Sequence, residues 1–440
     1  MTAWPTVTLD DVKAPIPRAM TDGPFGSNLT SAHYVDSGPQ VVRLGNIGDG
    51  VYKEAPVHIT WQHFENLRKH EVLPGDLLVA SLGETLPRAC LMPAHIGPSI
   101  VKADCIRVRL SENVDPRWVM YSMQRPQVRK WAEDHLHGIG RPRLGLKTIR
   151  QIPIPLPKLG EQQRIVEILE EHLSRLDAAD VGIATSARRL VSYRQAVRQH
   201  AVDASGSPAV SLASLISGVE AGKSLGGSAP PAALDEWGII KVSAMTWGEF
   251  REQENKSIPT DRADARYEIR PGDLLVSRAN TAAYVGASVL VGDVRPRLLL
   301  SDKSLRLVPR PGVNAKWLNE VLQSPRARDQ ITALATGTKE SMRNISQKSL
   351  LSVSVPNSSE DEQTAVIEAI DQGIGSSRDL ERAFYAARRR SASLRRSLLA
   401  AAFSGRLTGR SSDLDLAEEM SAAMEPEVAS AVGQEEALLW

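Results

Sequence analysis

The chain has 440 residues, which is too long for one ordinary domain and enough for two or three domains with separate cores. Its net charge of +1 at pH 7 excludes a global positive field, so any basic surface must arise from local segregation of charge. Its two cysteines, Cys90 and Cys105, exclude a disulfide framework, and no stretch approaches the ~18 to 20 apolar residues of a membrane span, so we expect a cytoplasmic protein.

Residues 1–157 are predicted to form a mixed α+β domain. Short β-rich runs bounded by Gly, Pro, Asn and Asp predict strands at 41–44, 77–80 and 106–110, and helical spacing occupies 116–134. Pro74-Gly75-Asp76 has the composition of a turn that feeds a buried strand. The carboxylate of Asp76 resembles an acid at a site, but the spacing favours a turn cap.

Residues 158–205 are predicted to form one long helix. From Glu161 onward the apolar residues follow a heptad. One seam position carries residues seven apart, and Ile165, Ala179 and Tyr193 fill the alternate position; the first set is Leu169, Leu176, Ile183, Leu190 and Val197.

Residues 206–356 repeat the first domain. The run Trp4–Leu9 is echoed by Ser207–Leu212, and Leu73–Val79 by Arg270–Val276. Trp118, Pro126 and Gly138 are matched by Trp317, Pro325 and Gly337, each displaced by 199 positions. Such ordered landmarks indicate an internal duplication, which predicts a second α+β domain with strands at 274–277 and 305–308 and helical spacing over 315–334.

Residues 357–410 are predicted to form a second long helix. Its apolar residues alternate steps of four and three, and Gly373 and Gly375 weaken its first turns. The seam positions are Val366, Ile370, Ser377, Leu380, Phe384, Ala387, Leu394, Leu398 and Ala401. Residues 411–440 are acidic and rich in alanine, so we expect a mobile tail there.

The two long helices are expected to pair as an antiparallel coiled coil, because each apolar stripe would otherwise face water. Since each helix follows an equivalent domain, this pairing gives a pseudo-two-fold molecule with the domains at opposite ends of a rod. At ~1.5 Å per residue the rod is about 60 Å long. The alternative is a helical hairpin inside one core, which the separation of the two seams in sequence disfavours.

Three stretches of this pattern resemble the specificity subunits of type I restriction-modification systems. They are the paired Pro-Gly-Asp-Leu-Leu motifs at 74–78 and 271–275, the junction IPIPLPKLGEQQRIV at 152–166, and LRRSLLAAAFSGRL at 394–407. The resemblance extends to about Gly409. The second copy matches less well, because Val355-Pro356 and Asp361-Glu362-Gln363 repeat the junction without its polyproline run.

The resemblance implies a non-catalytic DNA-recognition protein. In this family each globular part is a target recognition domain that reads one half of a bipartite site in double-stranded DNA, and the helices set the spacing. Two modification subunits, which are adenine-N6 methyltransferases that use S-adenosylmethionine, bind the helical region. Separate subunits translocate and cleave DNA. The resemblance therefore implies no catalytic residue, cofactor or metal in this chain.

Two pairs of segments are candidate DNA contacts. Loops after Gly138 and Gly337 join flexible backbone to cations suited to phosphates or guanine edges, and strand ends near 43–46 and 241–243 carry groups that could contact bases or phosphates. The alternatives are solvated surface charge for the loops and cations that snorkel at a strand edge. The candidate residues are Arg43, Asn46, Arg141, Arg143, Lys241, Ser243, Thr338, Lys339, Ser341 and Arg343.

Motifs of enzymes are absent or imperfect. The sequence lacks the Asn/Asp-Pro-Pro-aromatic motif and the Gly-rich cofactor loop of an adenine methyltransferase. The segment 218–224 resembles a phosphate-binding loop but has three residues between its glycines where four are required. His135 and His137 lack a third metal ligand at suitable spacing. The alternative function is a two-domain coiled-coil adaptor that binds protein partners without reading DNA.

Overall fold

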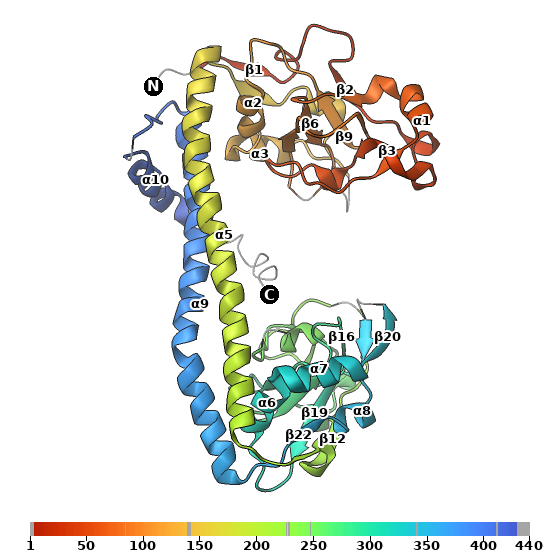
Figure 1. Ribbon diagram of the computed structural model, residues 1–440, viewed down its shortest axis with the longest axis vertical. Helices are drawn as coiled ribbons and strands as arrows, with labels where there is room; N and C mark the ends of the chain where they lie inside the picture. The colour runs from red at the N-terminus through yellow and green to blue at the C-terminus, as the bar shows by residue number, and fades with distance from the viewer. Residues whose placement is uncertain are drawn as a thin grey trace. The chain divides into compact units, whose positions relative to one another are not determined.

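A computed structural model (Figure 1) describes residues 4–83, 85–138, 142–225, 227, 229–246, 248–339, 342–410 and 412–428. The chain forms two compact units. Within the described residues, unit 1 comprises 4–182 with 387–428, and unit 2 comprises 183–386. The sequence-based boundaries fall where the long helices begin, whereas the units divide both helices in mid-length. Each helix segment therefore belongs with the globular part against which it packs.

Unit 1 is built on two four-stranded sheets. The antiparallel sheet has the order β2-β9-β6-β7, and the mixed sheet β4-β3-β8-β5 contains one parallel pair, β3 with β8. The bounds are β1 Thr6–Thr8, β2 Met20–Asp22, β3 Tyr34–Val42, β4 His58–Ile59, β5 Glu71–Val72, β6 Leu77–Ala80, β7 Arg88–Leu91, β8 Ser99–Val101, β9 Cys105–Val108, β10 Pro153–Pro155, α1 Trp61–Asn66, α2 Pro116–Ser122, α3 Pro126–Glu133 and α4 Leu146–Ile149. All four residues of β6 are buried because it lies inside its sheet and beneath other elements.

Unit 2 has a matching antiparallel sheet of order β12-β19-β15-β17, and two three-stranded sheets, β14-β13-β18 and β16-β21-β20. The bounds are β11 Ala209–Ser211, β12 Ile216–Ala221, β13 Gly238–Ile240, β14 Asn255–Ser257, β15 Leu274–Ser277, β16 Ala279–Asn280, β17 Ser288–Leu290, β18 Leu298–Leu299, β19 Ser304–Pro309, β20 Thr336–Lys339, β21 Met342–Asn344, β22 Ser354–Pro356, α6 Ala315–Gln323, α7 Pro325–Leu334 and α8 Gln347–Leu351. The α+β prediction for both globular parts is confirmed.

The duplication extends to individual side chains: an aspartate caps the turn before β6 in unit 1 and the turn before β15 in unit 2. The Asp76 carboxylate accepts a hydrogen bond from the Leu73 amide at 2.8 Å and two from Arg109 at 2.9 Å. Asp273 accepts one from the Arg270 amide at 2.8 Å and pairs with Arg306 at 2.8 Å. Both aspartates cap the turn before a buried strand, so the prediction of a structural carboxylate is confirmed.

A buried glutamine fastens the start of each long helix to its own unit. Gln162 accepts a hydrogen bond from the Asp115 amide at 3.0 Å and donates to the Pro157 carbonyl at 2.8 Å. Gln363 accepts from the Asn314 amide at 2.7 Å and donates to the Gly312 and Ser358 carbonyls at 3.0 and 2.9 Å. Asp115 and Asn314 cap α2 and α6, so each long helix starts at a fixed point of its domain.

The long helices are α5, Leu159–Ala204, and α9, Glu360–Phe403 (Figure 1). In unit 1, Ile165 and Leu169 of α5 share a buried core with Leu394 and Leu398 of α9, and Arg395 forms an ion pair with Asp177. The first part of α5 therefore packs with the last part of α9.

In unit 2, the last part of α5 packs with the first part of α9. Arg194 donates to Ser377 Oγ at 2.7 Å and pairs with Glu381 at 2.8 Å. The Tyr193 hydroxyl donates to the Gly373 carbonyl at 3.1 Å, and a Cβ on Gly373 would lie 2.7 Å from Val197 Cγ1. As the numbers rise along α5 they fall along α9, so these segments run antiparallel, and Gly373 permits their close approach.

Most of the predicted seam residues are buried or half-buried, but Ala179, Tyr193 and Leu380 are exposed. Val366 and Ile370 are 4% and 3% exposed, and Leu190 and Leu394 are each 8% exposed; Leu176, Ile183, Val197 and Phe384 are half-buried. Leu380 is 50% exposed, so its assignment to the seam is wrong. The step after buried Ser377 is four residues, which turns Glu381 rather than Leu380 toward Arg194.

The expectation of a mobile tail fails for its first part, because α10, Ser412–Val428, packs on unit 1. Ala417 and Asp413 are 0% and 1% exposed. The Asp413 carboxylate accepts hydrogen bonds from the amides of Thr408 and Gly409 at 2.9 and 2.7 Å. Burial acts to raise the pKa of Asp413, but these hydrogen bonds outweigh it and lower that pKa. Residues 429–440 lie outside the described part.

The environment of the two cysteines and the character of the helices agree with what the sequence predicts. Cys90 and Cys105 are buried, and burial raises the pKa of both thiols to about 12, as expected for two small core residues. No helix in the described ranges is long and apolar enough to cross a bilayer.

Candidate nucleic-acid interface

The segment after β3 holds two of the predicted contacts, and they differ in accessibility. Arg43 is half-buried and donates from Nη2 to the Ala55 carbonyl at 3.0 Å. Asn46 is 1% exposed. Its Oδ1 accepts from the Arg43 amide at 2.8 Å, and its Nδ2 donates to the Lys53 and Ala55 carbonyls at 2.9 and 3.4 Å. Asn46 thus does not present its amide to a base, and we reassign it to holding the 43–55 loop.

Asn46→Ala is expected to lower the free energy of unfolding by about 1–3 kcal/mol, because buried amide and carbonyl groups lose their partner. Urea denaturation followed by circular dichroism measures this loss. Asn28→Ala is the matched control, since the Asn28 side chain donates an exposed hydrogen bond to the Phe25 carbonyl. If the Asn46→Ala variant kept its stability but lost its preference for one DNA sequence, Asn46 would be a residue that contacts a base.

The equivalent segment of unit 2 exposes a cation. Lys241 is exposed and immediately precedes a short 3-10 helix, Val242–Met245. The Ser243 hydroxyl is half-buried and donates to Glu254 Oε2 at 2.6 Å. Lys241 is therefore the better placed of these two residues to contact a phosphate.

The two glycine-containing loops have the backbone that glycine favours. Gly138 and Gly337 have φ values of 101° and 138°, and a Cβ on Gly337 would lie 2.6 Å from the Met342 carbonyl oxygen. Arg141 and Ser341 lie outside the described residues. Thr338 and Lys339 belong to β20. A substitution at Gly337 would disturb the β20–β21 hairpin.

Arg143 and Arg343 lie in equivalent loops but at neighbouring register positions, because Arg143 pairs with His137 as Asn344 pairs with Thr336, and the two arginines have different partners. Arg143 is exposed, pairs with Asp104 at 2.7 Å, and lies 5.7 Å above the Phe25 ring. Arg343 donates to the Ala335 and Gly337 carbonyls at 3.0 and 3.3 Å, which ties together the ends of the hairpin. Sequence reasoning missed Phe25, which is 47% exposed. The sequence feature that could have indicated an exposed Phe25 is the turn composition of Phe25-Gly26-Ser27-Asn28.

The rejected enzyme motifs have structural roles. Gly218 lies in β12, paired antiparallel with β19, and the Ser217 hydroxyl donates to the Val308 carbonyl at 3.0 Å, so the first glycine of this segment belongs to a strand. His135 Nδ1 lies 2.7 Å from the Trp131 carbonyl oxygen, and its ring stacks on Trp131 at 4.3 Å. Among the residues described, no group of three or more His, Cys, Asp or Glu side chains could hold a metal ion.

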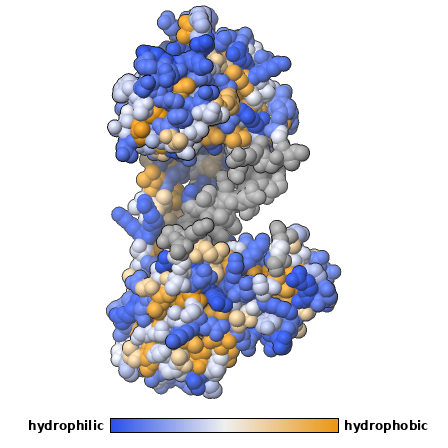
Figure 2. Space-filling model, turned by 90° about the vertical axis from the view of Figure 1, so that its right-hand side faces the viewer, coloured by the Kyte–Doolittle hydropathy of each residue, from blue (hydrophilic) through white to orange (hydrophobic). Residues whose placement is uncertain are grey.

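The visible faces of the two units are mainly hydrophilic (Figure 2). Figure 2 shows mainly hydrophilic side chains on each unit, with hydrophobic ones scattered between them. The candidate cations Arg43, Arg143 and Lys241 are therefore local features, as the net charge near zero requires.

Comparisons with known proteins relate this chain to type I restriction-modification specificity subunits. Residues 44–180 match the family model described as type I restriction modification DNA specificity domain. The chain is 35% identical over 147 residues to the type I restriction enzyme EcoEI specificity subunit of Escherichia coli, covering 33% of this chain and 25% of that one. It is 25% identical over 293 residues to the EcoKI specificity subunit of Escherichia coli strain K12, covering 62% of each chain.

A solved structure shares the fold over nearly the whole length. That structure, reported for the complex assembly and conformational transition of the type I R-M system, has a TM-score of 0.62 and 19% identity, covering 92% of this chain and 99% of its own. The chain spans a quarter of the length of the first curated relative and 62% of the second. The resemblance to specificity subunits of type I restriction-modification systems, predicted from the sequence, is thereby confirmed, and it is carried by the match of residues 44–180 to the DNA specificity domain.

Proposed function

We propose that this chain is the sequence-specific DNA-binding subunit of a cytoplasmic type I restriction-modification complex. Each unit reads one half of a bipartite site in double-stranded DNA. The paired long helices set the distance between the halves and hold two adenine-N6 methyltransferase subunits. Methyl transfer, translocation and cleavage are carried out by other chains, and this chain supplies recognition alone.

The observation that carries the proposal is that the two units share the same buried contacts but differ in their surface residues. Asp76 and Asp273 cap equivalent turns. Gln162 and Gln363 fasten the two long helices at equivalent points of the two units. At the surface, Arg43 in unit 1 corresponds to Lys241 in unit 2. Two units with the same frame can approach DNA with the same geometry, while different side chains select different bases.

The charges of the long helices support an antiparallel coiled coil as the spacer. Each helix is acidic near its start and basic toward its end, so antiparallel pairing brings opposite charges together. Asp177 with Arg395 and Arg194 with Glu381 are two such pairs. A parallel pairing would instead align acidic with acidic segments and basic with basic ones.

We expect Lys241→Ala, measured in complex with the methyltransferase, to weaken binding to all DNA sequences because a phosphate contact is lost. The plot of log affinity against log salt concentration should also become less steep by about one. Fluorescence anisotropy over a salt series, with a methylated-site duplex and an unrelated duplex, measures both quantities. Lys316→Ala is the matched control, because Lys316 pairs with Asp371 at 2.6 Å beside α9.

The same titration tests the proposed function as a whole. The unaltered complex should bind DNA with a steep salt dependence and prefer one bipartite sequence. Assembly with a protein partner but without DNA binding would favour the adaptor instead.

A further inference from the structure

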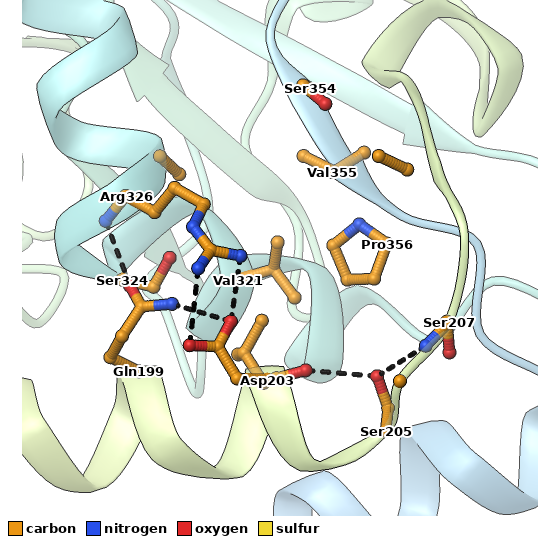
Figure 3. Close-up of a pocket in the computed structure, with 14 residues that line it drawn as sticks. Gln199, Asp203, Ser205, Ser207, Val321, Ser324, Arg326, Ser354, Val355 and Pro356 are labelled. Carbon is orange, nitrogen blue, oxygen red and sulfur yellow. Dashed lines mark hydrogen bonds and ion pairs between the residues drawn. The ribbon is translucent and has the colours of Figure 1, made fainter.

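Unit 2 contains a cavity of about 240 Å³ at the end of α5 (Figure 3). Its lining comes from α5, the chain leading into β11, the turn between α6 and α7, and β22. Val321 and Val355 form a buried apolar part, being 1% and 2% exposed. Ser205 and Ser207 lie on another side, and Asp203 pairs with Arg326 at 2.8 Å across the rim. The cavity thus combines an apolar interior with a charged entrance.

The internal repeat identifies the residues that occupy the same place in unit 1. Thr6 pairs with Pro155 in β1–β10, as Ala209 pairs with Pro356 in β11–β22. Counting back two residues along each strand aligns Trp4 with Ser207. Unit 1 therefore has an indole ring where unit 2 has a hydroxymethyl group.

The helix ends align in the same way. The Gly405 amide donates to the Ala402 carbonyl at 3.1 Å, and the Gly206 amide donates to the Asp203 carbonyl at 3.1 Å. Both glycines have positive φ, +70° and +61°. Phe403, two residues before Gly405, therefore corresponds to Ala204, so a second ring of unit 1 is also replaced by a small side chain.

The rings of unit 1 form a packed cluster. Trp4 meets Trp118 edge-on with centroids 5.4 Å apart, and Trp118 contacts Phe403 at 4.4 Å. A Trp4 ring atom lies 3.3 Å from where a Cβ of Gly405 would be. In unit 2 the counterpart of Gly405, Gly206, lines the cavity. Ser207, the counterpart of Trp4, lines the same cavity, so the cavity of unit 2 adjoins the place that the Trp4 side chain takes in unit 1.

We propose that this cavity binds an indole-sized aromatic side chain supplied by another protein chain. A planar ring that packs against Val321 and Val355 would bury its own apolar surface and that of the two valines. The Arg326 guanidinium at the rim can stack on the ring, and the serines can bond the peptide groups that carry it. Trp317 Nε1, buried without a hydrogen-bond partner, marks the same asymmetry, because its counterpart Trp118 donates to the Pro155 carbonyl at 2.7 Å.

We assign the ring to a protein partner because the ring at the corresponding place in unit 1, that of Trp4, is carried by a polypeptide. Trp4 leads directly into β1, and its successor Pro5 accepts a hydrogen bond from the Leu156 amide at 2.8 Å. Pro208 accepts the equivalent bond from the Asn357 amide at 2.9 Å. The proposal concerns protein contact and does not depend on DNA recognition.

The test measures binding of indole and of N-acetyltryptophanamide to the full chain by ligand-observed NMR. Both probes are expected to bind, and Ser207→Trp, which mimics Trp4, is expected to weaken both by about tenfold or more by filling the cavity. Ala209→Phe, at an exposed residue that lines the cavity, provides a second filling variant in case the first does not fold. Trp4→Ser is the matched control, since it should open an equivalent site in unit 1 and add a second equivalent of bound probe.

Three results would overturn the proposal. Absence of binding, or equal binding to the folded filling variants, would show that the cavity takes no aromatic ring. Binding of indole without N-acetyltryptophanamide would assign the cavity to a free small molecule. Binding that requires removal of residues 429–440, which end in Trp440, would identify this chain's own end as the occupant.

Discussion

Leu398→Asp is expected to unfold unit 1, whereas Leu380→Asp on the same helix is expected to be tolerated. Leu398 is 0% exposed and belongs to the core that contains Trp118 and Leu169. An aspartate there loses the apolar contacts and buries an unpaired carboxylate, which costs about 4 kcal/mol or more. Leu380 is 50% exposed, so its carboxylate variant should change stability by no more than about 0.5 kcal/mol.

Urea denaturation followed by circular dichroism measures both variants, and co-purification with the methyltransferase measures assembly. The pair is informative because both leucines lie on α9 and both satisfy the heptad in the sequence. Equal tolerance of the two substitutions would mean that α9 does not pack on unit 1 as described. Equal damage would mean that Leu380 is covered by a partner in the assembled complex.

Features that depend on neighbouring residues in sequence were predictable. The turns at Asp76 and Asp273 carry their own composition, and the strands that follow them are β6 and β15 almost residue for residue. The long helices were predictable because their apolar period extends over many turns. The duplication then gave the domain plan, since landmarks 199 residues apart require no knowledge of contacts.

Features set by tertiary contacts were not predictable. Asn46 looks like a base-reading amide in sequence, but it is buried because the 43–55 loop folds back over it. Leu380 fits the heptad, yet Arg194 on the other helix selects Glu381 for the facing position. The packing of α10 depends on Ala417 and Met420 meeting the core of unit 1. Each of these outcomes is decided by a segment more than a few residues away.

The cavity of unit 2 shows how a duplication can expose a difference that sequence comparison alone would treat as ordinary divergence. Exchange of Trp4 for Ser207 is one substitution among many. It gains meaning only because β1 and β11 have the same register with β10 and β22. The aromatic side chain of Trp4 in unit 1 thereby indicates which chemical group we propose for the cavity of unit 2.

Lengthening both long helices by one heptad is expected to widen the DNA spacer while leaving both half-sites unchanged. The division between the units falls after Gly182 in α5 and after Ala386 in α9. Seven residues inserted at each point preserve the apolar seam and leave both cores intact. Each insertion adds about 10 Å of helix, which corresponds to roughly three base pairs at ~3.4 Å each.

Sequencing of methylated adenines in cells that carry the double insertion measures the outcome. The expected result is a modified site with the same two half-sequences and a gap wider by about three base pairs. Insertion into α5 alone is the control, because an unmatched helix should shift the gap less or prevent assembly. Modification at an unchanged spacer by a correctly assembled double variant would exclude the helices as the ruler, while altered half-sites would mean that recognition and spacing are not separable in this chain.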